Sequence, residues 1–400
     1  MVVHRVERHV INANHKLYAM IDEYCFKSKN LYNKANYILR QQFFNDDKIY
    51  NYQQMCSEFK PWDEYKQMMA QSSQQTLKLL SDNWKSFFEA IKKYAEDSSK
   101  FKGKPKPPHY KKSDGRFVAK FTNQACKKID GYIRFPRVFK KFCLATKIDG
   151  KLKEVRMIPD SNKRYILEIV YEKVIAGKKD ENERYMGLDL GLNNLATVSS
   201  NVMSSVIING KGLKSINQFY NKTIAYYQSI AEKVNNAYRT KRLNRITNKR
   251  NNKINDYIHK ASRKIVNMCV DNNINTIIIG YNEEWKDEIN IGSVNNQNFV
   301  SIPFLEFVKK IEYKAVEYGI SVIRTEESYT SGTSFLDNEL PNKDFYNKSR
   351  RIKRGLFKSN SGRLINADVN ASLQIIKKVA PNTFSHGVED LVLNPIKILF

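Results

Sequence analysis

A chain of 400 residues is long enough for two or three domains, each with a hydrophobic core of its own. Its 68 Lys and Arg residues against 41 Asp and Glu residues give a formal charge of +27, which favours nucleic acid as a partner. No run approaches the ~18 to 20 apolar residues of a membrane-spanning helix. His4, Arg5, Glu7 and Arg8 also stand where a signal peptide needs apolar residues, so we expect a soluble intracellular protein with no membrane partner.

The cysteines point to neither disulfides nor zinc. There are five of them, an odd number, and no two are spaced as a C-x-x-C pair: Cys25, Cys56, Cys126, Cys143 and Cys269. A structural zinc site needs four ligands close together, and the usual ones are Cys and His. We therefore expect no bound zinc.

The first third of the chain has a helical pattern after one short strand. Val2–Ile11 alternates weakly, which is typical of a strand. The strongest helical stripe that follows is made of Leu77, Leu80, Trp84, Phe87, Ile91 and Ala95. Such a stripe most often marks a buried face, so we predict that it packs in a core.

A basic linker follows these helices. Lys100–Lys112 contains six lysines and three prolines and no acid, so it fits neither a helix nor a strand. A solvated charge run is the simplest interpretation. Aromatic residues interleave with the lysines, however, which favours contact with RNA phosphates and bases. The candidate residues are Lys104, Lys106, Tyr110, Lys111 and Lys112.

Two further patterns complete the chain. From Arg116 to Glu172 apolar residues alternate with polar ones, which predicts short strands around Ile133, Arg156 and Leu167. From Arg184 onward strands alternate with helices, which indicates an α/β layer domain. The whole chain is therefore expected to be an α+β multidomain protein.

Basic residues are concentrated at two places in the last part of the chain. Between Arg239 and Lys264 the only acid is Asp256, whereas a solvated helix would normally mix signs. The second cluster precedes the last acidic motif. Candidate nucleic-acid contacts are Arg239, Arg242, Arg245, Lys249, Arg250, Arg350, Arg351 and Arg354.

Two acids occupy positions suited to metal ligands. Asp189 closes an apolar strand and precedes a turn into a second strand. Asp368 opens a helix that Asn366 can cap. Turn chemistry alone could explain Asp189, and the helix dipole alone could explain Asp368. The motifs around the two acids are Met186–Thr197 and Asn366–Ala371.

These motifs resemble the first and third acidic motifs of the RuvC-type nuclease in TnpB proteins. TnpB proteins are transposon-encoded RNA-guided DNA endonucleases related to the miniature type V CRISPR effectors. Phe121–Gln124, Tyr329–Ser331 and Gly355–Phe357 belong to the same resemblance, and the order of the motifs makes it specific.

The resemblance implies a domain layout. It comprises a wedge β-barrel built from 1–11 and 114–180, with a helical recognition lobe inserted at 12–113. An RNase H-like (RuvC) nuclease domain at 181–400 follows and includes basic bridging helices at about 215–265. A remnant of the zinc ribbon of many relatives would lie at about 330–360, with Ser334, Asp337 and Ser359 near the positions of its cysteines. Without zinc, we expect Leu336–Phe357 to be a short loop or to be ordered by nucleic acid.

The third carboxylate departs from the common TnpB pattern. Most relatives have a Glu after the strand that corresponds to Thr276–Ile279, but this chain has Gly280. Either the site is inactive or another acid takes over, as in some TnpB proteins and the Fanzors. Glu327 ends the next strand, which should lie about 4.8 Å from the Gly280 strand. Glu326 is the alternative, and Glu283 and Glu284 are weaker candidates.

The resemblance thus implies a Mg²⁺-dependent nuclease in which Mn²⁺ can substitute. Asp189, Glu327 and Asp368 would be its metal ligands and catalytic residues. Its partners would be a guide RNA from the transposon end and double-stranded DNA with a short adjacent motif, in the bacterial cytoplasm at the nucleoid. A guided DNA-binding repressor without cleavage is the main alternative. An RNA-binding accessory factor is more remote.

Overall fold

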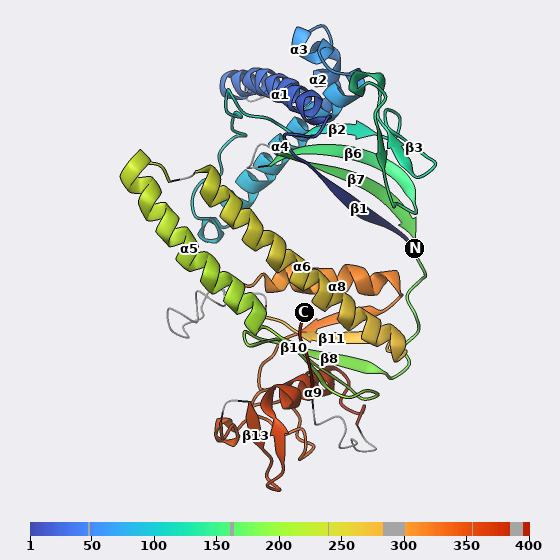
Figure 1. Cartoon of the computed structure of the whole chain (residues 1–400), viewed down its shortest axis with the longest axis vertical. Helices are drawn as coiled ribbons and strands as arrows, with labels where there is room; N and C mark the ends of the chain where they lie inside the picture. The colour runs from blue at the N-terminus through green and yellow to red at the C-terminus, as the bar shows by residue number, and fades with distance from the viewer. Residues whose placement is uncertain (47–48, 161–163, 239, 283–300, 354, 385–394) are drawn as a thin grey trace. The chain divides into compact units, whose positions relative to one another are not determined.

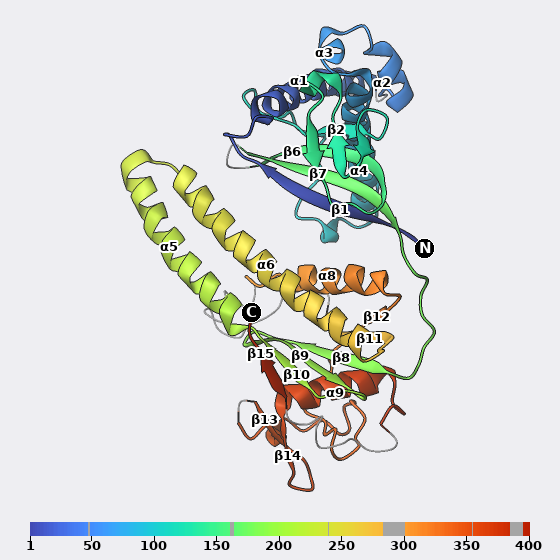
Figure 2. The same cartoon turned by 45° about the vertical axis from the view of Figure 1, so that its right-hand side comes forward.

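The computed structural model describes residues 1–400 except 47–48, 161–163, 239, 283–300, 354 and 385–394. The chain forms two compact units, Val2–Val174 and Ile175–Phe400, and Met1 belongs to the second. Each unit has a sheet and covering helices of its own (Figures 1 and 2). None of the described helices is both long and apolar enough to cross a membrane.

The Val2–Val174 unit contains two antiparallel sheets. The larger has the order β1-β7-β6-β2, and the smaller has the order β3-β4-β5. Their bounds are β1 (Val2–Ile11), β2 (Ala119–Thr122), β3 (Lys127–Ile129), β4 (Tyr132–Arg134), β5 (Cys143–Ala145), β6 (Lys151–Asp160) and β7 (Arg164–Val174). The expected strands are confirmed. The larger sheet is open at β1 and β2, so closure into a barrel is not seen among the described ladders.

The helices of this unit share one core with its strands. They are α1 (Tyr18–Asp46), α2 (Tyr52–Glu58), α3 (Asp63–Lys66) and α4 (Ala70–Glu96), with a short η1 (Ser98–Lys100) after them. α4 buries Leu77, Leu80, Trp84 and Phe87, which confirms that the aromatic stripe is a packing face. The Trp84 indole donates to Asn36 Oδ1 of α1 at 3.0 Å. A buried indole N–H is costly without such a partner.

The Ile175–Phe400 unit is built on a six-stranded sheet with the order β12-β11-β8-β9-β10-β15. Its strands are β8 (Tyr185–Leu190), β9 (Asn194–Ser200), β10 (Val206–Asn209), β11 (Thr276–Gly280), β12 (Ser321–Thr325) and β15 (Ile396–Ile398). β8, β11 and β12 are parallel neighbours, whereas β9 runs antiparallel to β8. The expected α/β alternation is thereby confirmed.

Alternation along β8 separates the two faces of this sheet. Met186 and Leu188 belong to the core that contains Ile265 of α6 and Phe307 of α8. Gly187 and Asp189 therefore point to the opposite face, on which α9 packs. The helices of the unit are α5 (Lys211–Asn235), α6 (Lys241–Asp271), α8 (Phe304–Glu317) and α9 (Ala367–Val379). Figure 2 shows α6 and α8 on one side of the sheet and α9 on the other.

Candidate active site

Gly187 determines how closely α9 approaches the sheet. A Cβ atom at this position would lie only 2.3 Å from the Ser372 carbonyl oxygen. Ser199, which is opposite Gly187 in the β8–β9 ladder, shares a hydrogen bond with the Ser372 hydroxyl. Asp189 lies two residues after Gly187 on the same face, and Asp368 lies one helical turn before Ser372. The close contact of helix and sheet therefore brings the two acids to the same place.

Asp368 is held in position by the start of α9. The Asn366 side chain caps the helix by accepting hydrogen bonds from the Asp368 and Val369 amides, as the sequence predicted. The Asp368 carboxylate accepts a hydrogen bond from Asn194 Nδ2 at 2.7 Å. It also lies 3.4 Å from Arg351 Nη2.

Glu327 follows the end of β12, directly beside the β11 strand. Its amide donates to Asn282 Oδ1 at 3.2 Å, and its carbonyl oxygen accepts from the Thr330 hydroxyl at 2.8 Å. Its Oε1 atom is buried and has no hydrogen-bond partner among the described residues. Glu326, in contrast, is exposed and accepts from Lys378 Nζ at 2.8 Å. The structure thus turns Glu327 inward and Glu326 outward.

The three acids line one cavity of about 500 Å³. Its other lining residues are Leu190, Gly191, Leu192, Asn193, Asn194, Thr197, Thr330, Ser331, Arg351, Gly355 and Ala371. Burial, with the charges of Glu327 and Asp368, raises the pKa of Asp189 well above its usual range. Burial raises the pKa of Glu327 to about 7. Burial in the cavity therefore disfavours the charged forms of Asp189 and Glu327.

This donor set fits a divalent cation, although the three carboxylates would have to move closer together to share one. Among the described residues, no three His, Cys, Asp or Glu side chains form a ready metal-binding group. The unpartnered Glu327 oxygen and the mutual repulsion at Asp189 are what a cation would relieve. Mg²⁺ prefers such carboxylate oxygens. Asp368 would have to exchange Arg351 for the metal.

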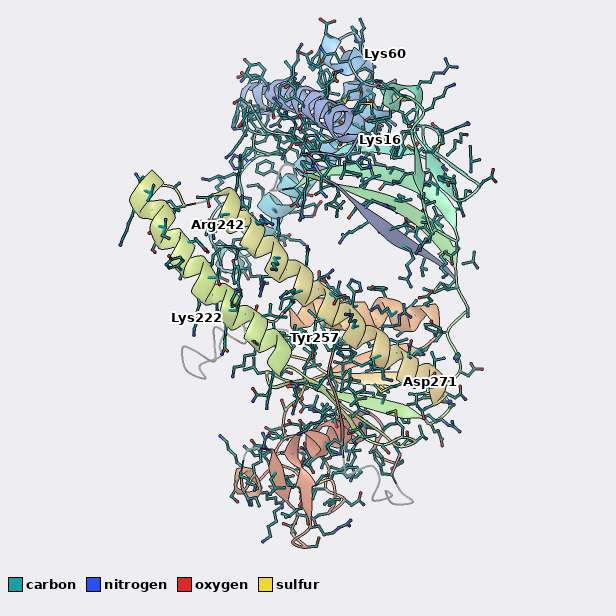
Figure 3. All side chains as sticks on the ribbon, viewed as in Figure 1. Lys16, Lys60, Lys222, Arg242, Tyr257 and Asp271 are labelled. Atoms are coloured by element: carbon teal, nitrogen blue, oxygen red, sulfur yellow. The ribbon has the colours of Figure 1, made fainter. Side chains whose placement is uncertain are left out.

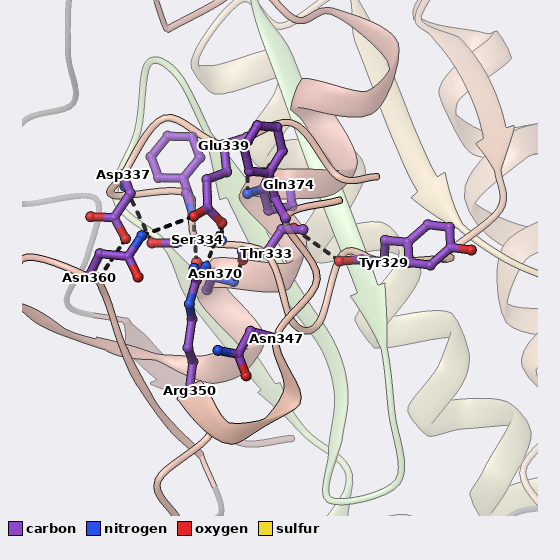
Figure 4. A network of polar contacts seen from close by, with 12 residues as sticks. Tyr329, Thr333, Ser334, Asp337, Glu339, Asn347, Arg350, Asn360, Asn370 and Gln374 are labelled. Atoms are coloured by element: carbon purple, nitrogen blue, oxygen red, sulfur yellow. Dashed lines mark hydrogen bonds and ion pairs between the residues drawn. The ribbon is translucent and has the colours of Figure 1, made fainter. Parts of the chain in front are cut away.

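A polar network occupies the region in which the resemblance predicted a remnant of a zinc ribbon (Figure 4). The Glu339 carboxylate, which is 8% exposed, lies at its centre. It accepts from the Ser334 amide at 2.7 Å, from Arg350 Nη1 at 2.5 Å and from Asn360 Nδ2 at 3.1 Å. Asp337 accepts from the Asn360 amide at 2.7 Å. Hydrogen bonds to one buried carboxylate thus join three separate segments.

Helix α9 anchors the same region through its own side chains. The Asn370 side chain donates to the Thr333 carbonyl at 2.8 Å and accepts from the Phe335 amide at 2.9 Å. Gln374 donates to the Glu339 carbonyl at 3.2 Å. The region also contains η3 (Lys348–Arg350) and the hairpin β13 (Leu356–Lys358) and β14 (Leu364–Asn366). The expected loop is therefore ordered by its own contacts, and neither zinc nor nucleic acid is needed to explain that order.

The basic linker is fixed along α1 in an irregular conformation. Asn33 makes two hydrogen bonds of 2.8 Å with the Lys111 backbone, and Asn36 donates to the Pro108 carbonyl at 2.9 Å. Lys104, Lys106, Tyr110 and Lys112 are exposed. Lys111 is not, because its ammonium lies 4.8 Å from the centre of the Tyr32 ring. Lys111 thus has a packing role in this structure, and its contact with nucleic acid stays a prediction.

The first half of α6 carries an exposed basic stripe. Figure 3 labels Arg242 near the start of this helix and Asp271 at its end. Arg245, Lys249 and Lys253 are exposed at intervals of four residues, whereas the helix is buried from Tyr257 to Cys269 on its sheet side. The stripe thus lies along one face of the helix.

Three of the predicted basic contacts are engaged by the protein itself. The Arg250 guanidinium donates to Asn217 Oδ1 at 2.8 Å and to the Ser301 carbonyl at 2.7 Å. The Arg242 guanidinium lies 3.7 Å from the centre of the Tyr227 ring. The Arg350 guanidinium is held by Glu339, and its contact with substrate phosphates stays a prediction. Arg239, Arg354, Glu283 and Glu284 lie outside the described residues.

Several residues of this region were not singled out from the sequence. Asn194, Thr197 and Asn370 belong to the two acidic motifs. Membership in these motifs is the signal that could have identified them as residues of the site. Thr197 is opposite Asp189 in the β8–β9 ladder, and its buried hydroxyl has no partner among the described residues. Glu339 had no local signal, because its partners come from distant segments.

Comparison with known proteins gives two family matches. Residues 168–286 match the OrfB_IS605 family, described as a probable transposase. Residues 304–375 match the Cas12f1-like TNB domain. The two matches cover the β8 motif and the α9 motif respectively.

Individual relatives agree with these families. The chain is 24% identical to the TnpB-like protein ORF457 of Acidianus two-tailed virus over 88% of this chain and 81% of that protein. It is 28% identical to the CRISPR-associated endodeoxyribonuclease Cas12f2 of a Micrarchaeota archaeon, over 55% of this chain but only 41% of that protein. A solved Cas12f1–sgRNA–target DNA complex aligns with 17% identity over 93% of this chain and 98% of that chain, at a TM-score of only 0.37. The family matches and the two sequence relatives confirm the resemblance of this chain to TnpB proteins.

Proposed function

We propose that this protein is an RNA-guided DNA endonuclease. It binds a guide RNA derived from the transposon end and cuts double-stranded DNA that carries a short adjacent motif. The observation that carries the proposal is the meeting of Asp189, Glu327 and Asp368, from three separate elements, in one cavity. The names of the two sequence relatives, one TnpB-like and one an endodeoxyribonuclease, support it.

The proposed architecture follows from the same family. The strand order β12-β11-β8-β9-β10 supports an RNase H-like nuclease core, with Asp189 near the end of β8, Glu327 just after the edge strand β12 and Asp368 on α9. In the other unit, the sheet that contains β1 and β7 would act as the wedge, and the helices between β1 and β2 as the recognition lobe. α5 and α6 would be the bridging helices.

The chemistry proposed for the cavity is hydrolysis of a phosphodiester. Bound Mg²⁺, or Mn²⁺ in its place, would supply a nucleophilic water at neutral pH and neutralise charge on the attacked phosphate. Asp189, Glu327 and Asp368 would hold the cations. Asn194, which donates to the Asp368 carboxylate, orients that ligand. Gly191 and Asn193 line the same cavity.

Two surfaces are proposed to hold nucleic acid by charge. One is the stripe of Arg242, Arg245, Lys249 and the neighbouring Lys253 on α6. The other is the linker, where Lys104, Lys106 and Lys112 project from a backbone that α1 has already fixed and the exposed Tyr110 ring can stack on a base. A preordered cationic strand loses less conformational entropy on binding than a flexible one does.

The test begins with the RNA that copurifies with the protein. Its sequence defines the guide, and a DNA duplex that matches its 3′ end can then be offered with a randomised flanking region. We expect Mg²⁺-dependent cutting of duplexes with one flanking motif. Guided DNA binding without cutting, in Mg²⁺ and in Mn²⁺, would favour the repressor. The absence of a discrete RNA would favour the accessory factor.

A further inference from the structure

Gly280 ends strand β11 next to the carboxylate of Glu327. It is paired with Thr325 in the β11–β12 ladder, and the Tyr281 amide donates to the Thr325 carbonyl at 2.8 Å. Beyond this point Asn282 accepts from the Glu327 amide. The two strands therefore stay joined until Glu327, whose side chain then folds back toward Gly280.

The space above Gly280 is already filled. A Cβ atom there would lie 2.8 Å from both Cγ and Oε1 of Glu327, and 2.7 Å from Cδ1 of Ile375 on α9. Side chains do not tolerate contacts this short, so something must move. The backbone at Gly280 does not have a positive φ, unlike Gly131 or Gly319. Glycine is therefore needed here for space and not for conformation.

The two neighbours differ in how easily they can yield. Ile375 is fully buried between α9 and the sheet, in contact with Ile278 and Ile376. The Glu327 carboxylate is the end of a flexible side chain and is held by no hydrogen bond at Oε1 from the described residues. A methyl group at position 280 would therefore push the carboxylate aside before it moved the helix.

We propose that Gly280 is a positioning residue, whose missing side chain creates the place in which the Glu327 carboxylate faces Asp189. Positions 280 and 327 are then alternative hosts for one carboxylate, and only one of them can be filled. The proposal rests on the proposed metal-dependent nuclease function. It adds that the glycine is as necessary to the site as the acid beside it.

The first experiment measures Mn²⁺ affinity of the full-length chain by electron paramagnetic resonance, with Asp189→Ala as the baseline for other sites. Gly280→Ala is expected to weaken the Asp189-dependent Mn²⁺ affinity by roughly 10- to 100-fold, the range for loss of a supporting contact. Gly177→Ala is the matched control, because a Cβ atom there meets nothing within 4 Å. Unchanged Mn²⁺ affinity in Gly280→Ala would overturn the proposal.

A second variant distinguishes displacement of the Glu327 carboxylate from disturbed packing of α9. Ile375→Val removes the Cδ1 atom that a Cβ atom at position 280 would meet, but leaves Glu327 untouched. We expect Gly280→Ala with Ile375→Val to remain weak in Mn²⁺ binding. If Ile375→Val restores the affinity, the defect was helix packing and the positioning role is wrong.

The reciprocal exchange completes the test. Gly280→Glu with Glu327→Gly and Ile375→Val should recover Mn²⁺ affinity that Glu327→Gly alone loses. Failure of this exchange in a variant that melts like the wild type would contradict the shared place for one carboxylate. Because Mn²⁺ affinity is measured without DNA, wild-type protein that binds Mn²⁺ but never cuts would refute the nuclease function and leave the role of Gly280 intact.

Discussion

The three carboxylates of the cavity differ in what holds them. Asp368 is fixed by Asn194 and by the helix that it opens. Glu327 is positioned through its backbone, and its Oε1 has no partner among the described residues. Asp189 is buried beside both, and this raises its pKa. At the scale of single residues, burial and the neighbouring charges both disfavour the charged form of Asp189, and a bound cation or a proton would relieve this.

Neighbouring acids give the sharpest residue-level comparison. Glu327→Gln keeps the shape of the side chain but removes its charge, and we expect cleavage to fall by orders of magnitude while guided DNA binding is kept. Glu326→Gln is the control, because Glu326 is exposed and pairs with Lys378. Single-turnover cleavage of one target duplex measures both. Equal rates for the two variants would contradict the inward role of Glu327.

The Thr197 hydroxyl offers a second prediction at this scale. It is buried opposite Asp189 without a partner among the described residues. Thr197→Val preserves the shape, and the loss of a hydrogen bond to Asp189 or to a bound water in the loaded site should slow cleavage about tenfold. The melting temperature should be unchanged or higher, because an unpaired buried hydroxyl is costly. A wild-type cleavage rate would mean that the hydroxyl serves packing only.

At the scale of elements, α9 is the piece on which the site depends. Asp368, Ser372 and Ile376 face the sheet, whereas Asn370 and Gln374 hold the region around Glu339. The sequence predicted the helix and its cap, because both signals are local. It predicted the two acids through their motifs. Only the family resemblance implied that they meet in one site, because the physical cause is the contact between Gly187 and Ser372 over a long separation in the chain.

Gly187→Ala tests this dependence. The added Cβ atom would lie within 2.3 Å of backbone on α9, and backbone cannot move aside as a side chain can. We expect a loss of about 1–3 kcal/mol in unfolding free energy, together with slower cleavage, although Gly187 is not among the residues that line the cavity. Urea unfolding and single-turnover cleavage measure the two effects. A variant with wild-type stability and rate would show that α9 is not set by this contact.

The Glu339 network makes a prediction about zinc. Glu339→Gln leaves the Arg350 guanidinium partly buried without its counter-charge, and breaking such a pair costs about 3–5 kcal/mol when it is fully buried. We expect Glu339→Gln to lower the free energy of unfolding clearly. The double variant Glu339→Gln with Arg350→Gln should lower it less, because no unpaired guanidinium remains. EDTA should leave the melting temperature of RNA-free wild type unchanged. A fall with EDTA that added zinc reverses would contradict the metal-free account.

At the scale of the molecule, charge is the feature that the sequence displayed most clearly. Part of the net charge of +27 lies in the exposed basic stripe on α6, and part lies in the linker that is fixed on α1. Composition could not show which basic residues are exposed. Arg250 is bound by Asn217, and Lys111 packs on the Tyr32 ring. That distinction depends on tertiary neighbours. The same limit applies to Glu339, whose partners are spread over three segments.

The central claim is that Asp189, Glu327 and Asp368 form one metal site for guided DNA cleavage. The most direct measurement is the cleavage rate of one guided target over a Mg²⁺ titration, with binding of the same duplex measured in parallel. We expect Asp189→Ala, Glu327→Ala and Asp368→Ala each to abolish cleavage at every Mg²⁺ concentration and to bind the duplex as the wild type does. Wild-type cleavage by any one of the three variants would contradict the account.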